Sequence, residues 1–204
     1  MTARLVVLAS GSGTNLQAII DACGSGRLDA EVVHVITNRV DAKAATRAQN
    51  AGISTSCHLL NGNGSAGADR ASRRRAYDAA LAGAVEFHRP DFLVLAGWMH
   101  LLTSSFLDRF AGRVVNVHPA LPDTFPGAHA IDDAWAAHLQ AGLDHTGVMV
   151  HLVPDEGVDD GPVVQVRRVD ILDSDTRESL EERIHQVEHE ILVVAIAQMI
   201  TDSK

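Results

Sequence analysis

Asn116 and His118 stand two residues apart at the end of a short apolar run that begins at Arg113, and Pro119 follows them. Side chains alternate along a strand, so both would point the same way, with Cα atoms about 6.6 Å apart. An asparagine amide can donate to an oxyanion, and a histidine can donate when protonated or move protons near neutral pH. Pro119 restricts His118 to an extended backbone and leaves it at an exposed strand end. The spacing predicts an oxyanion and proton-transfer site; the alternative is a turn asparagine beside a structural histidine.

Acidic residues gather in residues 154–162, directly after an expected strand that contains His151. One carboxylate turned toward His118 would favour the imidazolium form, raise the pKa of that histidine and fix its orientation. A run of acids is equally typical of a solvated loop, and the residue types alone do not choose between the two. The four candidates are Asp155, Glu156, Asp159 and Asp160.

A glycine-rich segment, Ser10-Gly-Ser-Gly13-Thr-Asn15, lies between an expected strand and an expected helix. Glycines let the backbone approach a ligand, and a helix N-terminus offers free N–H groups to a phosphate. A Rossmann dinucleotide site would need a third glycine where Leu16 stands and an acid where Asn38 stands. A Walker loop would need Gly-Lys-Ser/Thr, which is absent. The pattern therefore disfavours NAD and ATP and leaves either a phosphate site or a tight turn that binds nothing.

The elements that would position these residues form an alternation of short apolar runs and helical patterns. This alternation predicts an α/β fold over residues 1–204: one Rossmann-like domain, a mostly parallel twisted sheet with helices on both faces. The expected strands cover residues 4–9, 31–37, 55–58, 92–96, 113–116, 148–153 and 163–169. The expected helices cover residues 15–23, 42–51, 74–88, 130–141 and 176–199.

The last expected helix has the clearest signals. Asp175 can cap it with Glu178 at N3, and an apolar stripe runs along one side. The members of that stripe are Leu180, Ile184, Val187, Ile191 and Ala195. Residues 61–67, by contrast, are glycine-rich and polar, which predicts a flexible connection.

Composition narrows the class of protein. The 204 residues are 46% hydrophobic and 21% charged, which is ordinary for a soluble domain with a sizeable core. The formal net charge of −9 argues against nucleic acid or an anionic membrane as partner. Cys23 and Cys57 lack a C-x-x-C partner, and His185 and His189 lack a metalloprotease pattern, so we expect no metal. The apolar run 5–9 is too short for a signal peptide or a membrane span, which predicts a cytoplasmic protein.

Four motifs together resemble those of the folate-dependent formyltransferases, and they occur in the order that the family shows. The resemblance runs from Leu5 to about Val194. It implies the formyltransferase fold and an enzyme of purine biosynthesis that moves a formyl group from 10-formyltetrahydrofolate to the amine of phosphoribosylglycinamide. It implies no metal, no nucleic acid and no membrane, and leaves monomer and homodimer open. The motifs are Gly11-Ser-Gly13-Thr-Asn15, Asn116-Val-His118-Pro119-Ala-Leu, Phe125-Pro-Gly127 and Asp159-Asp-Gly-Pro162.

The resemblance assigns catalysis to Asn116, His118 and Asp159. Asn116 and protonated His118 would stabilise the oxyanion. His118, with Asp159 and an ordered water, would move a proton from the attacking amine to the departing folate nitrogen. This chain carries one more residue between His151 and the acid than the commonest pattern, so Asp159 is preferred over Asp160 on its spacing to the following Gly-Pro pair.

The resemblance also assigns the two binding regions. Gly13, Thr14 and Asn15 would hold the phosphate of the ribotide and Glu188 would contact the same substrate; the alternative for Glu188 is an exposed helix glutamate. Backbone groups of residues 99–102, with Asn116 and Arg74, would hold the folate. Relatives often carry arginine where this chain has His100, which backbone contacts would tolerate, and Leu-Leu-Pro where residues 121–123 read Leu-Pro-Asp. The four residues of the folate segment are Met99, His100, Leu101 and Leu102.

Three rival functions share part of this pattern. Formyltetrahydrofolate hydrolases and methionyl-tRNA formyltransferases use the same catalytic trio, together with an amino-terminal regulatory domain or a carboxy-terminal RNA-binding domain. The chain starts at its first strand and stops after one helix, so we expect neither domain. A rival of another class is a non-catalytic nucleotide-binding module, in which the glycine loop binds phosphate and Asn116 and His118 do no chemistry.

Overall fold

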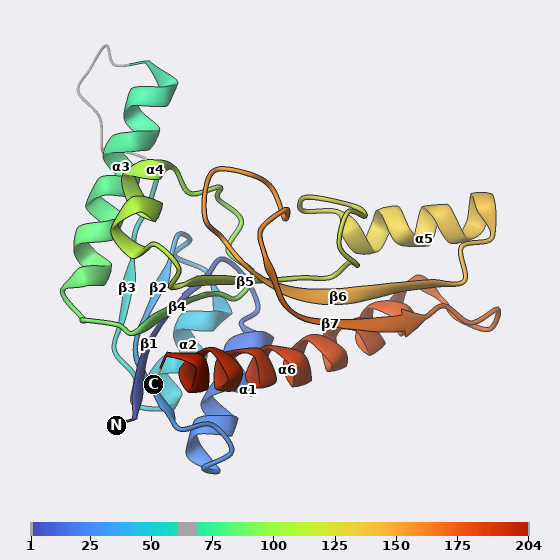
Figure 1. The fold of residues 1–204 in the computed structure, drawn as a ribbon, viewed down its shortest axis with the longest axis horizontal. Helices are drawn as coiled ribbons and strands as arrows, with labels where there is room; N and C mark the ends of the chain where they lie inside the picture. The colour runs from blue at the N-terminus through green and yellow to red at the C-terminus, as the bar shows by residue number, and fades with distance from the viewer. Residues whose placement is uncertain (1, 61–68, 204) are drawn as a thin grey trace.

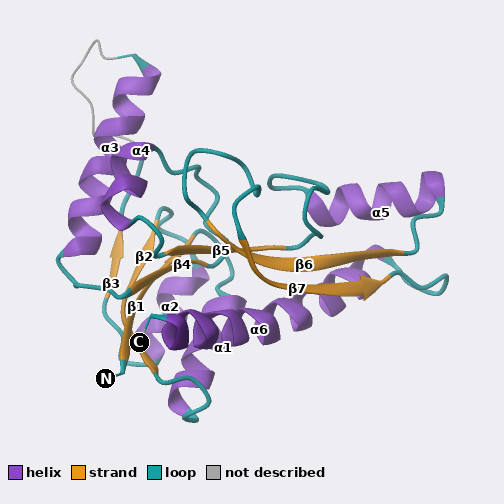
Figure 2. Cartoon of the chain, in the orientation of Figure 1, coloured by secondary structure: helices purple, strands orange, loops and turns teal. Residues whose placement is uncertain are grey.

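A single seven-stranded sheet covered by helices organises the chain (Figures 1 and 2). The computed structural model describes residues 2–60 and 69–203, so the expected flexible connection at 61–67 lies outside the described residues. The strands are β1 (Ala3–Ala9), β2 (Ala30–Thr37), β3 (Thr55–Cys57), β4 (Phe92–Leu95), β5 (Val114–His118), β6 (His145–Leu152) and β7 (Val163–Asp170). The helices are α1 (Thr14–Gly24), α2 (Lys43–Asn50), α3 (Arg70–Glu86), α4 (Ser104–Leu107), α5 (Ala130–Ala141) and α6 (Arg177–Asp202), with a 3-10 turn, η1 (Asp108–Phe110).

Every strand and helix expected from the sequence is present, with two differences among the helices. The chain adds α4, one turn that is too short to show a helical period. Helix α3 begins at Arg70, four residues earlier than expected, because the Asp69 carboxylate caps it by accepting from the Ser72 N–H at 2.7 Å. The basic residues 73–75 therefore lie inside the first turns of α3.

The sheet has the order β3-β2-β1-β4-β5-β6-β7. Neighbours from β3 to β5 run parallel, whereas β6 is antiparallel to both β5 and β7, so the expected mostly parallel sheet is confirmed. The strand order changes direction between β1 and β4. In open α/β sheets the crevice outside the carboxyl ends of the strands at such a switch point is where ligands bind.

Helices cover both faces because side chains alternate along the central strands. Leu5 and Val7 of β1 pack in one apolar cluster with α1, α2 and α6. Val6 and Leu8 pack in a second cluster with α3 and α4, on the opposite side of the sheet in Figure 1. No helix in the described parts of the chain is both long and apolar enough to cross a membrane.

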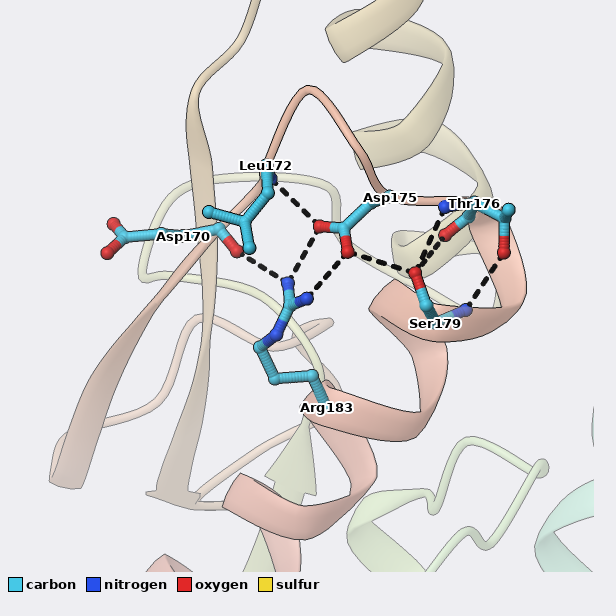
Figure 3. A network of polar contacts seen from close by, with 6 residues as sticks. All are labelled: Asp170, Leu172, Asp175, Thr176, Ser179 and Arg183. Carbon is cyan, nitrogen blue, oxygen red and sulfur yellow. Dashed lines mark hydrogen bonds and ion pairs between the residues drawn. The ribbon is translucent and has the colours of Figure 1, made fainter.

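The start of α6 differs by one residue from the expected cap (Figure 3). Thr176 is the N-cap: its hydroxyl accepts from the Ser179 N–H at 3.2 Å, and the Ser179 hydroxyl accepts from the Thr176 N–H at 3.0 Å. Asp175 instead accepts from the Leu172 N–H and from two nitrogens of Arg183. A serine rather than Glu178 closes the box, so the expected pairing was wrong. The apolar stripe of α6 packs against the core as expected, with Val187 partly buried and the other four residues buried.

Candidate active site

A pocket of about 340 Å³ lies at the carboxyl ends of β1, β4 and β5. The chain segments that follow β1 and β4 form two of its walls, β5 and the acidic loop form a third, and α6 adds Glu188 and His185. It therefore occupies the switch point of the sheet, where a ligand is expected. The site residues predicted from sequence that line it are Gly13, Thr14, Asn15, Met99, His100, Leu101, Leu102, Asn116, His118, Asp159 and Glu188.

Strand β5 presents Asn116 and His118 to this pocket, as the two-residue period predicts. The strand ends at His118, directly before Pro119. The expectation of an exposed strand end was wrong, because only 3% of His118 is accessible. The loop after Pro119 folds back, and the His118 Nε2 atom lies 3.0 Å from the carbonyl oxygen of Phe125.

Asp159 is the acid that meets His118. One oxygen, Oδ2, lies 3.3 Å from His118 Nδ1 and accepts from the Gly127 N–H at 2.8 Å. The other, Oδ1, accepts from the Asn116 amide at 3.1 Å. Asp160 is exposed and approaches Gly157 instead. Asp159 has a φ of +55°, a left-handed backbone that aspartate tolerates better than most residues.

His151 is a site residue that sequence reasoning missed. It pairs directly with Asn116 across β5 and β6, so their side chains share one face of the sheet. Its Nε2 lies 3.4 Å from Asp159 Oδ1 and 3.2 Å from the Asn116 amide nitrogen, and only 2% of the residue is accessible. The signal was a lone histidine in an apolar strand, but its partner depends on an antiparallel register that the sequence does not specify.

The His118 ring lies between two hydrogen-bond acceptors, which favour its protonated form, whereas its burial favours the neutral form. A neutral imidazole can donate to only one of Asp159 and the Phe125 carbonyl, whereas an imidazolium can donate to both. Burial nevertheless lowers the pKa of His118 below its ordinary value, despite the opposing effect of Asp159. The expected rise was therefore wrong in sign, because it counted the carboxylate and not the loss of solvent.

The carboxyl group of Asp159 stays ionised in the same surroundings. Burial by itself would raise the pKa of Asp159, but hydrogen bonding from His151 and from the Gly127 N–H, with the charge of His118, lowers it below the ordinary value. A fixed anion thus lies beside two histidine rings, and it orients both of them.

The glycine loop turns into α1 at Gly13, which has a φ of +70°. Helix α1 has no side-chain cap and no acidic residue in its first turn, so the N–H groups at its start remain available to an anion. Asn15 points toward α6, where its amide donates to Glu188 Oε2 at 3.2 Å. The loop and α6 are therefore joined at the floor of the pocket.

Glu188 is buried rather than exposed, with 5% of the residue accessible, so the reading of a solvated helix glutamate was wrong. Burial raises the pKa of Glu188 to about 7; the bond from Asn15 opposes this rise and the charge of Glu181 adds to it. His185, which has no metalloprotease pattern in the sequence, also lines the pocket, with its Nε2 3.9 Å from Glu188 Oε2.

The expected folate segment and Arg74 lie in different places. Residues 99–102 line the pocket, and the Met99 N–H donates to the Ser10 hydroxyl at 2.9 Å, which ties this segment to the end of β1. Arg74 does not line the pocket. Its Nε lies 3.5 Å from Asp78 Oδ2, and the same oxygen accepts from the Thr103 N–H at 2.8 Å. The structure therefore brings Arg74 to the end of the segment and not into the pocket.

Comparison with known proteins shows the family of this chain. A family model described as formyl transferase matches residues 3–196, and the chain belongs to this family. Its relatives include the phosphoribosylglycinamide formyltransferase of Schizosaccharomyces pombe, 47% identical over 209 residues that cover 100% of both chains. The Escherichia coli enzyme of the same name is 38% identical over 194 residues, 95% of this chain and 85% of that protein. The crystal structure of phosphoribosylglycinamide formyltransferase from Bacillus halodurans matches with a TM-score of 0.86 at 34% identity, covering 98% of this chain and 97% of that one.

Proposed function

We propose that this chain transfers the formyl group of 10-formyltetrahydrofolate to the amine of phosphoribosylglycinamide in purine biosynthesis. The observation that carries the proposal is the meeting of Asn116, His118 and Asp159 in the same pocket as the uncapped glycine loop. A phosphate anchor beside a proton-transfer site suits a phosphorylated amine that attacks an acyl donor. The names of the relatives support phosphoribosylglycinamide as the acceptor of the formyl group.

The ribotide would bind at the start of α1. Gly13, Thr14 and Asn15 line the pocket there, and the first N–H groups of the helix are free to bind a phosphate. A chain with a net charge of −9 needs such local donors to hold an anionic substrate. Glu188, fixed by Asn15, would accept hydrogen bonds from the same substrate in its ionised form.

The reaction forms one C–N bond and breaks another. The substrate amine attacks the formyl carbon, and the carbonyl oxygen becomes an oxyanion that Asn116 and protonated His118 would stabilise. In this structure the Asn116 amide donates to Asp159 and lies 3.2 Å from His151 Nε2, so the oxyanion would replace one of these partners. Losing one such donor typically costs ~2.7–4 kcal/mol of transition-state stabilisation.

His118 would then move a proton from the attacking amine to the departing folate nitrogen, through an ordered water. Its lowered pKa makes the protonated ring a ready donor: it would give its proton to the folate nitrogen, and the neutral ring would then accept the proton of the amine. Asp159, ionised and 3.3 Å away, would stabilise the imidazolium as it forms and hold the ring in place. No step of this scheme requires a metal ion.

The folate would lie along residues 99–102. Met99 and Leu101 are more than half exposed, so they offer an apolar surface for a flat ring, while the backbone offers polar groups. The contact of Arg74 with the same cosubstrate remains a prediction, because its guanidinium pairs with Asp78 here.

An assay with both substrates tests the proposal. We expect the purified protein to form formylated ribotide and deformylated folate in equal amounts, and to leave 10-formyltetrahydrofolate intact when the ribotide is omitted. Loss of the formyl group without ribotide would favour the hydrolase, and formylation of methionyl-tRNA would favour the other rival. No product from a folded protein would favour the nucleotide-binding module.

Replacing His118 tests the chemistry. His118→Ala should lower turnover at saturating substrate by at least ~10²-fold, because it removes the group that moves the proton. His129→Ala is the matched control, since that ring lies on the surface with 78% of its side chain accessible. The melting temperature of both variants should be measured, because His118 is buried. A His118→Ala variant that keeps most of its activity would contradict the mechanism.

A further inference from the structure

Helix α2 lies behind the glycine loop and bonds to two successive carbonyl groups of it. The Ala44 N–H donates to Gly11 O at 3.1 Å, and Arg47 Nε donates to Ser12 O at 2.8 Å. These bonds link segments more than thirty residues apart in the chain. Both carbonyl groups therefore point toward α2.

A planar trans peptide places the N–H of the next residue opposite the carbonyl group. The N–H groups of Ser12 and Gly13 consequently point away from α2, and both residues line the pocket. In the described parts of the chain, neither N–H donates to another residue. The two hydrogen bonds from α2 thus orient the Ser12 and Gly13 N–H groups toward the pocket, where they can donate to a ligand.

The glycine loop packs closely against α2 at Gly13. A Cβ atom added at Gly13 would lie 2.7 Å from Ala44 Cα, and Gly13 already has a φ of +70°. A bulky residue at Gly13 would therefore displace the loop from α2, and its effect could not be assigned to lost phosphate binding. Arg47 is the better residue to change, because its side chain reaches the loop without forming its backbone.

Arg47 also brings positive charge to the back of the loop. A hydrogen bond from a guanidinium polarises the Ser12–Gly13 peptide and strengthens the Gly13 N–H as a donor. Its Nη1 reaches Gln17 Oε1 at 3.5 Å, so one side chain connects α2, the loop and α1. We propose that Arg47 is a positioning residue that sets the glycine loop for the phosphate of the substrate, an inference that rests on the proposed function.

Steady-state kinetics of Arg47→Ala test this role. We expect the KM for the ribotide to rise about tenfold, the usual effect of losing one hydrogen bond to a charged group. The KM for the folate and the turnover number should change less than about twofold, because neither depends on this loop. Arg47→Lys should restore part of the ribotide affinity, because an ammonium can still donate to Ser12 O. Arg27→Ala is the matched control: its guanidinium is exposed and, among the described residues, donates only to the Ser25 hydroxyl.

Inorganic phosphate gives a readout that does not depend on activity. We expect phosphate to raise the melting temperature of the wild-type protein and of Arg27→Ala, and to do so much less for Arg47→Ala. A wild type that binds phosphate but does not formylate the ribotide would contradict the proposed function and leave the role of Arg47 standing. An unchanged ribotide KM and phosphate response in Arg47→Ala, or an equal loss for both substrates, would overturn the inference.

Discussion

Asp159 contacts His118, His151, Asn116 and the Gly127 N–H, whereas Asp160 faces away from all of them. The contacts explain how one carboxylate can orient two rings and an amide at once. Asp159 lines the pocket, whereas Asp160 is exposed and lies against Gly157. The orientation of His118 and His151 therefore depends on Asp159 in particular, and not on how many acidic residues the loop contains.

Asparagine at each of these two positions makes the sharpest comparison, because asparagine keeps the size of aspartate and tolerates the same backbone. Asp159→Asn removes the negative charge that favours imidazolium, so the pKa of His118 should fall further below its ordinary value. Turnover should drop by at least ~10²-fold, and Asp160→Asn should change it less than about twofold.

The pH–rate profile and the titration of His118 by NMR would measure both effects. A large loss of turnover in Asp160→Asn instead would mean that Asp160, and not Asp159, is the acid that acts on His118. Normal activity in both variants would mean that the acids only keep the loop soluble.

Among the elements, α6 has an ion pair between Arg183 within the helix and Asp175, which lies just before its N-cap (Figure 3). The hydrogen bonds from Arg183 lower the pKa of Asp175 well below its ordinary value. A carboxyl group with a depressed pKa stabilises the folded state above its unfolded pKa, and this stabilisation is lost as the pH falls through its folded pKa. The contribution should therefore be complete at neutral pH and vanish in strong acid.

Asp175→Asn should consequently destabilise the protein by ~2 kcal/mol at neutral pH, the usual effect of losing hydrogen bonds to a charged group. The difference from wild type should shrink as the pH is lowered toward ~2, because the carboxyl group binds a proton in the unfolded chain below pH ~4 while the ion pair keeps it ionised in the folded chain. Denaturant unfolding at both pH values would measure it, with the exposed Asp173→Asn as control. A difference that does not change with pH would mean that the ion pair contributes nothing.

On the scale of the whole molecule, Glu188 and Asn15 join segments 173 residues apart and put a buried carboxyl group between α1 and α6. Its pKa of about 7 lies above that of the unfolded chain. The folded state therefore holds a proton that the unfolded state has already released, and stability falls as the pH rises from ~4.5 through ~7. Active-site carboxylates often carry such a cost in stability.

Glu188→Gln should remove this cost. Relative to wild type, the variant should become more stable at pH ~8 than at pH ~5, by up to about 3 kcal/mol. Its affinity for the ribotide should fall, because a neutral amide replaces the ionised acceptor. Unfolding free energies across this range, with the exposed Glu182→Gln as control, would check the prediction. Parallel pH profiles for variant and wild type would rule out a buried carboxyl group with a raised pKa.

The sequence by itself determined what depends on near neighbours. Alternation along one strand placed Asn116 and His118 on the same face, and Pro119 ended that strand. The glycine segment marked the turn into α1. The spacing of apolar residues predicted the remaining strands and all the helices that are longer than one turn. These features follow from backbone geometry and side-chain spacing within a few residues, which any stretch of sequence displays.

The tertiary structure decided everything that depends on distant partners and on loss of solvent. The pairing of β5 with β6 brought His151 to Asn116, and the fold of the acidic loop selected Asp159. Burial lowered the pKa of His118, for which the sequence had suggested a rise. It raised the pKa of Glu188, for which the sequence had left a substrate contact and an exposed side chain both open. The position of α2 behind the glycine loop likewise has no local signal. A residue's charge state and contacts depend on which surfaces the packed chain removes from water, and sequence spacing does not record that.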